Sequence, residues 1–542
     1  MGCATSTTYC CTSSYYRDPH PRLFNVQFAT AVIPSRRDAL FLFALVLAVN
    51  GSAALFIRTP GYMDAAYYFA GGLRLVRGFG LTEPYLWNYL SGIDSLPVPG
   101  SLFWPPLTSF VAAGGMALLG EFFRAAQVPF VLLATLLPFL SYQISHQLGN
   151  DRSASFIAGL LTVFSGFFLI TWSATESFVI FSTVGVLAFL SFSRGLENDK
   201  IHWLFLTGLL VGAAHLTRAD GVLLLLVFVG VLSRRKSNYP LWAGVLIAGY
   251  LLVMSPWFLR NMAAIGSPLA PGGVRTLWLR EYNDLFLYPA TDITLERYLA
   301  QGWGEIFRGK LWAFGQNLQT LFFVHGMIFL APFSLVGFWR LRRRILVLSV
   351  LIYTVLLFIF MTFVFTFPGA RGGFFHSGAV LLPFFIATGV RGLDHVVKSV
   401  AVRRSSWQLE QAQKVFRAGA VGLAVLLSAL IFNMRLLNGG WSFYDDLFSE
   451  IGEQLPPDSV IASNNPPGLY AAVGLAGVFI PSGDEIMLRA VVQQFDVDYV
   501  LLDENHVPAL APLYAGEVDP DFLCTPEEAA PGMLLFKVAP CD

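Results

Sequence analysis

The chain has 542 residues, of which 55% are hydrophobic and only 13% are charged. Soluble globular domains carry about 25% charged residues, so this composition nearly excludes a soluble protein and indicates apolar surface that faces lipid. The 35 basic and 35 acidic residues cancel to a formal net charge of zero, which argues against nucleic-acid binding. The five cysteines are too few for a disulfide scaffold and lack the paired spacing of a zinc site.

Residues 1–38 are expected to form a disordered cytoplasmic leader. The opening letters MGCATS formally fit a myristoylation pattern, but a basic, Ser- and Tyr-rich stretch before the first apolar segment is more simply explained as an unmodified leader. The first apolar segment starts only near residue 39, too late for a cleavable signal peptide.

Residues 39–437 are predicted to form a mainly α-helical, polytopic transmembrane bundle, because a helix needs about 20 apolar residues to cross the hydrocarbon core. Eleven candidate spans are residues 39–57, 126–148, 153–172, 177–193, 201–216, 219–233, 241–260, 320–339, 345–366, 374–390 and 416–437. The apolar segment 105–120 is shorter, and counting it as a span would invert every later loop. We interpret it as an interfacial or re-entrant helix.

The sidedness of the bundle follows from its basic residues, which concentrate in cytoplasmic loops. Basic runs at residues 234–236, 340–344 and 391–417 are assigned to the cytoplasm, and this places the N-terminus inside and the C-terminus outside. The inner segments then carry an excess of Lys and Arg, and the outer segments an excess of Asp and Glu. A multi-pass protein of the plasma (inner) membrane is expected.

Three outer segments are long, and functional residues are found most often on such segments. They are residues 58–125, residues 261–319 and the tail 438–542. The tail alternates helical DDLFSEIGEQL and DEIMLRAVVQQF with strand-like SVIAS, GVFIP and DYVLLDE, which predicts a small extracytoplasmic α/β domain with a short parallel sheet. An oxidising exterior would permit a bridge between Cys524 and Cys541.

Two acidic residues are candidates for catalysis. Asp64 soon follows the first span, and desolvation at the membrane surface would raise the pKa of its carboxyl group and tune it as a general base for a hydroxyl proton. The alternative is that Asp64 caps the helical stretch AAYYFAGGLRLV after it. Glu176, between the third and fourth spans, is assigned to the same surface, where it could orient the base, bind a sugar hydroxyl or hold a metal ion.

Polar residues interrupt the apolar sequence at HLTRADG, where Arg218 and Asp220 lie between the fifth and sixth spans. A charged hairpin at this position is costly unless it is paired or used in function. Arg218 could therefore bind substrate, or it could form an internal ion pair with Asp220 or Glu176.

Further basic residues lie at outer span ends, where the positive-inside rule predicts fewest. Arg260 ends the seventh span, and Arg371, with His376 just behind it, lies in the loop FPGARGGFFHSG. Arginine offers a planar fork for phosphate, so these residues could bind either a lipid-linked substrate or ordinary phospholipid headgroups.

Aromatic residues crowd the outer interface, where their rings could stack against a sugar or form the aromatic belt of a membrane protein. They are Tyr67, Tyr68, Trp87, Tyr89, Trp104, Trp257 and Trp278. His146, His202 and His215 are dispersed without ligand spacing, so a metal site built on histidine is not expected. No P-loop, GxSxG, HExxH or dinucleotide fingerprint occurs, which argues against NTP hydrolysis and zinc proteolysis.

The order of these features resembles that of the GT-C glycosyltransferases. The Asp in the first outer loop is followed by the aromatic pair Tyr67 and Tyr68, by FWPPLTSF, and by the second acid about a hundred residues on. Over roughly residues 39–390 the chain is similar to the family of dolichyl-phosphate-mannose protein mannosyltransferases and lipid A aminoarabinose transferases.

The resemblance implies a catalytic base at Asp64 and a second acid at Glu176, where many relatives have Asp. It also implies that Arg218 and Arg260, in segments similar to LTRADG and PWFLRN, line a donor pocket. The commoner first-loop pattern is Asp-Glu, whereas Ala65 follows Asp64 here, so the role of that second acid is vacant or has moved to Glu176. Some relatives need a divalent metal ion and others do not, which leaves this cofactor open.

Motifs and resemblance together predict a glycosyltransferase that moves a sugar from a polyprenyl-phosphate-linked donor to an unknown glycan, lipid or protein acceptor outside the membrane. The resemblance implies inversion at the anomeric carbon. Tyr67, Trp104, Asp220, Arg371 and His376 are expected to contact the substrate. Two other functions stay open. A multi-span transporter or flippase should place ionisable groups near the bilayer midplane, and a membrane scaffold would tolerate loss of Asp64.

Overall fold

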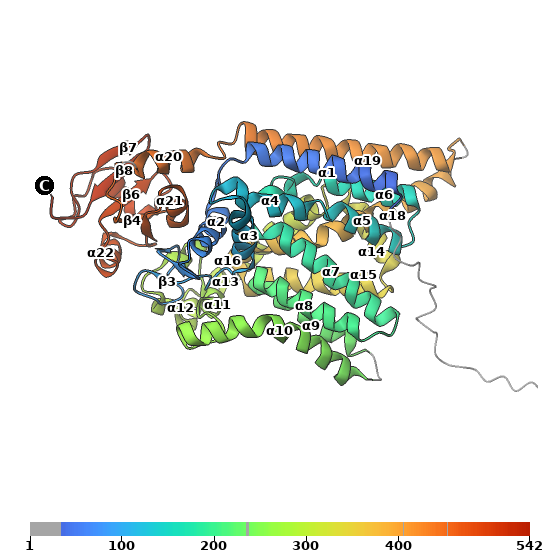
Figure 1. The fold of residues 1–542 in the computed structure, drawn as a ribbon, viewed down its shortest axis with the longest axis horizontal. Coiled ribbons are helices and arrows are strands. Elements are labelled where there is room, and N and C mark those ends of the chain that lie inside the picture. The colour runs from blue at the N-terminus through green and yellow to red at the C-terminus, as the bar shows by residue number, and fades with distance from the viewer. Residues whose placement is uncertain (1–33, 235–237, 405, 453, 542) are drawn as a thin grey trace, which may run out of the picture.

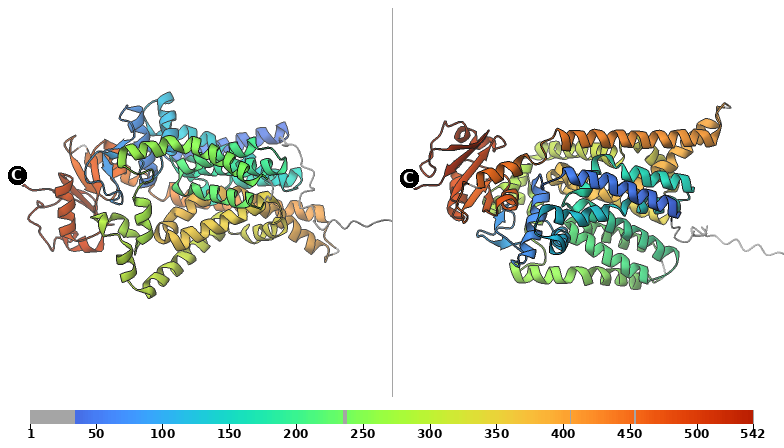
Figure 2. Two further views of the ribbon diagram at one scale, coloured as in Figure 1. Left: turned by 90° about the horizontal axis from the view of Figure 1, so that it is seen from below. Right: turned by 45° about the horizontal axis from the view of Figure 1, so that its top comes forward.

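The structure is a computed structural model that describes residues 34–234, 238–404, 406–452 and 454–541. Its helices form a bundle that runs mostly along the long axis, and a domain containing a β-sheet lies beyond one end (Figures 1 and 2). We refer to this end as the domain end of the bundle and to the other as the opposite end. Most of the predicted leader 1–38 lies outside the described residues.

Within the described part of the chain, seven helices are long and apolar enough to cross a membrane, and one bent pair is an eighth candidate. The seven are Arg36–Phe56 (α1), Phe123–Gln147 (α4 and α5), Ser177–Glu197 (α7), Tyr239–Ile265 (α10), Ile345–Val364 (beginning with α15), Thr366–Ala401 (including α16, α17 and α18) and Leu409–Leu437 (beginning with α19). The bent pair joins Arg152–Val163 (α6) to Gly166–Ser173 at 49°.

The other helices are shorter or lie outside the bundle proper. They are Met63–Val76 (α2), Leu107–Leu119 (α3), His202–Thr217 (α8), Val222–Leu232 (α9), Gly272–Arg275 (α11), Leu295–Ala300 (α12), Trp303–Gln319 (α13) and Ala331–Leu341 (α14). Within the long segments, α16 is Thr366–Pro368, α17 is Phe374–Gly378 and α18 is Leu382–Ala401. The predicted interfacial or re-entrant segment 105–120 corresponds to α3.

The mainly helical, polytopic fold is confirmed, but the predicted eleven spans exceed the helices long enough to cross a membrane. At about 1.5 Å per residue, α8 with 16 residues and α9 with 11 residues fall short of a hydrocarbon core of about 30 Å. The predicted span 320–339 is broken: the π-helix Thr320–His325 ends before Met327 and Ile328, which have φ of 49° and 55°, and α14 begins after them. Hydropathy alone does not detect such breaks.

Small residues allow close contact between neighbouring helices. Where α8 and α10 cross, a Cβ added at Gly249 would lie 2.4 Å from the Phe205 carbonyl oxygen, and one at Gly208 would lie 2.0 Å from the Leu246 carbonyl oxygen. The outward faces instead carry large apolar side chains such as Leu252, which is 63% exposed. An apolar exterior around a tightly packed interior is the arrangement expected in lipid.

The domain beyond the bundle contains a six-stranded sheet in the order β2-β5-β4-β6-β8-β7. Its strands are Tyr85–Leu86 (β2), Val460–Ser463 (β4), Ala476–Phe479 (β5), Tyr499–Asp503 (β6), Glu527–Ala530 (β7) and Met533–Lys537 (β8), and its helices include Phe443–Gly452 (α20), Pro466–Val473 (α21) and Glu485–Gln494 (α22). The predicted parallel arrangement holds for β4 with β5 and β6, whereas β8 runs antiparallel to both β6 and β7. A disulfide joins Cys524 to Cys541.

One edge strand of this sheet comes from outside the tail. β2 lies in the first outer segment and pairs in parallel with β5, Tyr85 opposite Gly477 and Leu86 opposite Val478. The same segment forms a two-stranded antiparallel ladder from Thr82–Glu83 (β1) and Val98–Pro99 (β3). Strands of two residues carry no detectable alternation, so the sequence could not predict that the first outer segment joins the tail in one sheet.

Candidate active site

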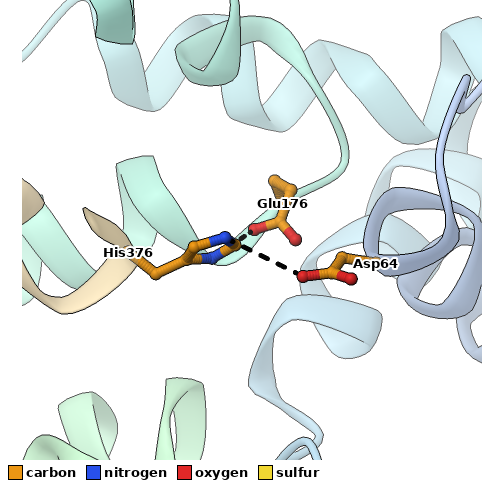
Figure 3. A group of neighbouring side chains, drawn as sticks. All are labelled: Asp64, Glu176 and His376. Carbon is orange, nitrogen blue, oxygen red and sulfur yellow. Dashed lines mark ion pairs between the residues drawn. The ribbon is translucent and has the colours of Figure 1, made fainter. Parts of the chain in front are cut away.

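Two acids and a histidine come together at the domain end of the bundle (Figure 3). Asp64 lies in the first turn of α2, Glu176 is the N-cap of α7, and His376 lies on α17. The Nδ1 atom of His376 lies 3.4 Å from Oε2 of Glu176, and its Nε2 atom lies 3.8 Å from Oδ2 of Asp64. Sequence reasoning assigned both acids to one surface and expected His376 to contact the substrate. In the structure the ring of His376 faces the two carboxylates.

Glu176 is fully buried and is held from several sides. Its Oε2 accepts hydrogen bonds from the backbone N–H of Ser177 at 2.7 Å and from the Ser177 hydroxyl at 3.1 Å, so it caps α7. The adjacent Thr175 hydroxyl donates to the carbonyl oxygen of Ala65 in α2 at 3.0 Å. The other carboxylate oxygen, Oε1, has no hydrogen-bond partner in the described part of the chain, and such a buried oxygen gains from binding a hydroxyl or a cation.

Asp64 is more accessible, with 31% of its side chain exposed. Tyr62 occupies the N-cap position of α2, so Asp64 is not the capping residue that the alternative hypothesis required. Burial, followed by repulsion from the neighbouring Glu176 carboxylate, raises the pKa of Asp64 to about 6. A carboxylate with a raised pKa is a better proton acceptor than an ordinary one.

Arg218 contributes positive charge to the same region, where it opposes the rise in the pKa of Asp64. Its Nε atom donates to Oδ1 of Asp220 at 3.2 Å and to the hydroxyl of Ser377 at 3.0 Å, and Ser377 also donates to Asp220. The ion pair with Asp220 is therefore present. Ser377 follows His376 directly, so this network also ties the histidine-bearing helix α17 to the turn between α8 and α9.

Arg371 approaches from the segment just before α17. Its guanidinium carbon lies 5.2 Å from the ring centroid of Tyr282. Burial, and then the charge of Asp64, raises the pKa of Tyr282 to about 12, while Arg371 acts in the opposite direction. The charges of Asp64 and Arg371 thus both act on the hydroxyl group of Tyr282, which lies in the second outer segment.

Arg260, Tyr67 and Trp104 lie in an adjoining cluster built around the first outer segment. Arg260 donates to the carbonyl oxygen of Leu81 at 2.9 Å, and the Tyr67 hydroxyl donates to Oε1 of Glu83 at 2.6 Å. The rings of Tyr67 and Trp104 are 4.9 Å apart. Burial raises the pKa of Glu83 to about 7. These contacts hold the outer segment in shape, and they do not include the Asp64, Glu176 and His376 side chains.

Sequence reasoning overlooked three residues of this region: Glu83, Tyr282 and Ser377. Glu83 was detectable only as a single acid among aromatic residues in LTEPYLW. Tyr282 lies in irregular backbone, where no periodicity indicates the direction of a side chain. Ser377 is one of many serines, and only its tertiary contacts distinguish it.

The three central side chains also fit a divalent metal ion. One ligand atom from each of Asp64, Glu176 and His376 lies within 4.8 Å of the others, and carboxylate oxygens with an imidazole nitrogen suit several divalent metals. The free Oε1 of buried Glu176 supports this fit. The expectation that no histidine would contribute to a metal site rested on three other histidines and did not consider His376.

Known proteins share parts of this sequence and its fold. Residues 104–259 match the family model of dolichyl-phosphate-mannose-protein mannosyltransferase. The archaeal oligosaccharyltransferase AglB from Archaeoglobus fulgidus, in complex with an inhibitory peptide and a dolichol-phosphate, has a TM-score of 0.57 at 13% identity over 88% of this chain and 70% of its own. ArnT from Cupriavidus metallidurans, bound to undecaprenyl phosphate, has a TM-score of 0.57 at 14% identity over 93% and 98%. No curated protein matches the chain.

Proposed function

We propose that this chain, which has the fold of the GT-C membrane glycosyltransferases, transfers a sugar from a polyprenyl-phosphate-linked donor to an acceptor hydroxyl, with Asp64 as the general base. The observation that carries the proposal is the position of Asp64, a partly exposed carboxylate of raised pKa beside Glu176 and His376. That AglB and ArnT were solved with dolichol-phosphate and undecaprenyl phosphate supports a polyprenyl-phosphate donor here.

In the proposed reaction the acceptor oxygen attacks the anomeric carbon of the donor sugar. Its proton passes to Asp64, the new bond joins acceptor oxygen to sugar, and the bond from anomeric carbon to phosphate oxygen breaks, leaving its electron pair on the polyprenyl phosphate. Attack opposite to the leaving group inverts the anomeric centre. Glu176, which is buried and fixed by its cap to α7, keeps the pKa of Asp64 raised and offers Oε1 to a sugar or acceptor hydroxyl.

Negative charge that develops on the leaving phosphate requires fixed positive charge. Arg218 and Arg371 are proposed to supply this positive charge. Arg218 acts electrostatically on Asp64 itself, and Arg371 acts on Tyr282, which also feels the charge of Asp64. Arg260 is engaged with Leu81 and Asn261, so we assign it to shaping the first outer segment. A divalent ion held by Asp64, Glu176 and His376 would supply further positive charge beside the reacting groups.

The proposed location of this chemistry is the extracytoplasmic side of the plasma membrane. The basic runs of the sequence support a cytoplasmic opposite end, and the candidate site lies at the domain end. Nucleotide sugars are cytoplasmic, so a lipid-linked donor suits a site on the outer side.

The proposal is tested by reconstituting the purified protein with radiolabelled polyprenyl-phospho-sugars and a membrane extract as acceptor. General bases contribute about 10²- to 10⁴-fold to rate, so Asp64→Asn, which keeps the size of the side chain but accepts no proton, should reduce label transfer by at least about 100-fold. Asp446→Asn, on the exposed face of α20, is the matched control and should transfer at the wild-type rate.

Two results would contradict the proposal. Equal transfer by wild type and Asp64→Asn, with both proteins folded, would exclude Asp64 as the base. Failure of the wild-type protein to transfer label from any donor in a broad panel would favour a transporter of a lipid-linked substrate.

A further inference from the structure

The N-terminus of α2 has no capping side chain. Tyr62, at the N-cap, makes no side-chain hydrogen bond to the first turn of α2, although Asp64 lies in that turn. Since helices begin with free N–H groups that a cap normally satisfies, this helix start depends on other contacts for its position.

Those contacts come from the start of the C-terminal domain, more than 380 residues away in sequence. Oδ2 of Asp445, on α20, accepts a hydrogen bond from the backbone N–H of Gly61 at 2.8 Å. The indole Nε1–H of Trp441 donates to the carbonyl oxygen of Thr59 at 3.0 Å. The Trp441 ring also packs edge-on against Tyr62, with centroids 5.5 Å apart.

The fit between this turn and the Trp441 ring is tight. Gly61 has a φ of +79°, and a Cβ placed on it would lie 2.4 Å from Nε1 of Trp441, so only glycine allows this approach. Asp445 is itself 6% exposed, which shields its bond to Gly61 from competing water. Three residues beyond Gly61, Asp64 is within ion-pair distance of His376.

On the bundle side, α2 is anchored close to Asp64 by the hydrogen bond from Thr175 to the carbonyl oxygen of Ala65. One turn further on, the side chains of Tyr68 and Ser177 are also hydrogen-bonded. The turn before Asp64 is thus held by the C-terminal domain and the residue after it by the bundle, and the carboxylate is placed between the two.

We propose that Trp441 and Asp445 of the C-terminal domain are positioning residues for Asp64, fixing the turn Thr59–Gly61 so that the carboxylate faces Glu176 and His376. The inference rests on the proposed function of Asp64, and it gives the C-terminal domain a direct part in the reaction. Loss of either contact lets the start of α2 move, and misplacement by about 1 Å can cost about 100-fold in rate.

The test compares four variants of the full-length protein. Asp445→Ala removes the acceptor for Gly61, Asp445→Asn restores an acceptor oxygen without charge, and Trp441→Phe keeps a ring but removes the donor to Thr59. Asp446→Ala, next to Asp445 but exposed, is the matched control. Hydrogen exchange of the peptide covering residues 58–66 and the kinetic constants of sugar transfer are measured for each.

We expect Asp445→Ala and Trp441→Phe to accelerate exchange in residues 58–66 and to lower kcat by about 10- to 100-fold with the KM for the lipid donor changed less than about twofold. Asp445→Asn should recover most of kcat and of the protection, and Asp446→Ala should match wild type. The inference is overturned if exchange in residues 58–66 is unchanged in both disruptive variants, or if kcat falls without faster exchange.

The exchange measurement needs no activity, so the two proposals fail separately. If the wild-type protein transfers no sugar, the proposed function is wrong. Unchanged exchange in both Asp445→Ala and Trp441→Phe, with the wild type active, instead means that the C-terminal domain does not hold the Asp64 turn.

Discussion

At the scale of single residues, the pKa of Asp64 is set by burial and by the charged groups around it. An ordinary Asp has a pKa of 3.8, and partial burial together with the Glu176 charge raises the pKa of Asp64 to about 6. Arg218 and His376 act in the opposite direction, which keeps a large fraction of Asp64 ionised at neutral pH.

This environment predicts a pH dependence. Asp64 accepts a proton only when ionised, so the transfer rate should fall about tenfold per unit as the pH drops below about 6. Glu176→Gln removes the charge that raises the pKa of Asp64 and should shift this acid limb to lower pH. Rate profiles from pH 4.5 to 8 measure the shift, with the exposed Glu410→Gln as a control; an acid limb unmoved by Glu176→Gln would contradict the assignment.

A second prediction concerns a metal ion. Because Asp64, Glu176 and His376 offer ligand atoms within 4.8 Å of one another, the wild-type protein should bind Mn²⁺, and Glu176→Gln or His376→Ala should weaken binding by at least about tenfold. Electron paramagnetic resonance of the purified protein during Mn²⁺ titration measures the free ion. If metal-stripped protein binds no added Mn²⁺ and transfers sugar at full rate, the assignment of a metal site to these three residues is wrong.

At the scale of elements, the bundle depends on close helix crossings. α8 and α10 touch along their backbones at Gly208 and Gly249, where no side chain larger than hydrogen fits. α10 then leads to the second outer segment, and α8 ends at Thr217 with Arg218 as its C-cap residue. The crossing of α8 and α10 therefore fixes the position of Arg218 relative to the loop that carries Tyr282.

The importance of this crossing can be tested with two glycines of one helix. Gly249→Leu should destabilise the protein, because its Cβ would lie 2.4 Å from the Phe205 carbonyl oxygen and overpacking of a core typically costs about 1–3 kcal/mol. Gly244→Leu, also on α10, has no atom within 4 Å of the added Cβ and should leave stability near wild type. Thermal unfolding in detergent compares the two; equal midpoints would show that the helices separate at no cost.

At the scale of the whole molecule, the two ends of the bundle carry different charged groups. Asp64, Glu176, His376 and Arg218 lie at the domain end, whereas the basic run 340–344, between α14 and α15, lies at the opposite end (Figure 1). The C-terminal domain is joined to the bundle by strand β2, by the ring contact of Tyr85 with Tyr470 at 5.3 Å, and by the contacts of Trp441 and Asp445.

The proposed sidedness predicts which end can be labelled from outside. In a protein with Cys3, Cys10 and Cys11 replaced by serine, a membrane-impermeant maleimide should label Asp519→Cys in intact cells but Lys200→Cys only after permeabilisation. Both positions are exposed. The opposite pattern of labelling would reverse the proposed orientation. The control is the triple-serine protein without an added cysteine, in which Cys524 and Cys541 are bridged.

Much of this molecule could be predicted from the sequence because the forces involved act locally along the chain. Long apolar runs identify most of the long helices, since exposing them to water is costly. Alternating strands and helices identify the α/β tail. The order of the charges along the spans assigns Asp64 and Glu176 to one end, because each span reverses the side of the chain.

Other features were decided only by tertiary contacts. The turn of His376 toward both carboxylates depends on a kinked stretch before α17, where Gly372 has a φ of +150°. The two-residue strand β2 and the hydrogen bond that Gly61 donates to Asp445 join segments nearly 400 residues apart. Apolar length and charge order therefore predicted the helical bundle and the end at which Asp64 and Glu176 lie. Which side chains meet was settled by packing between distant segments, which leaves no periodic signal in the sequence.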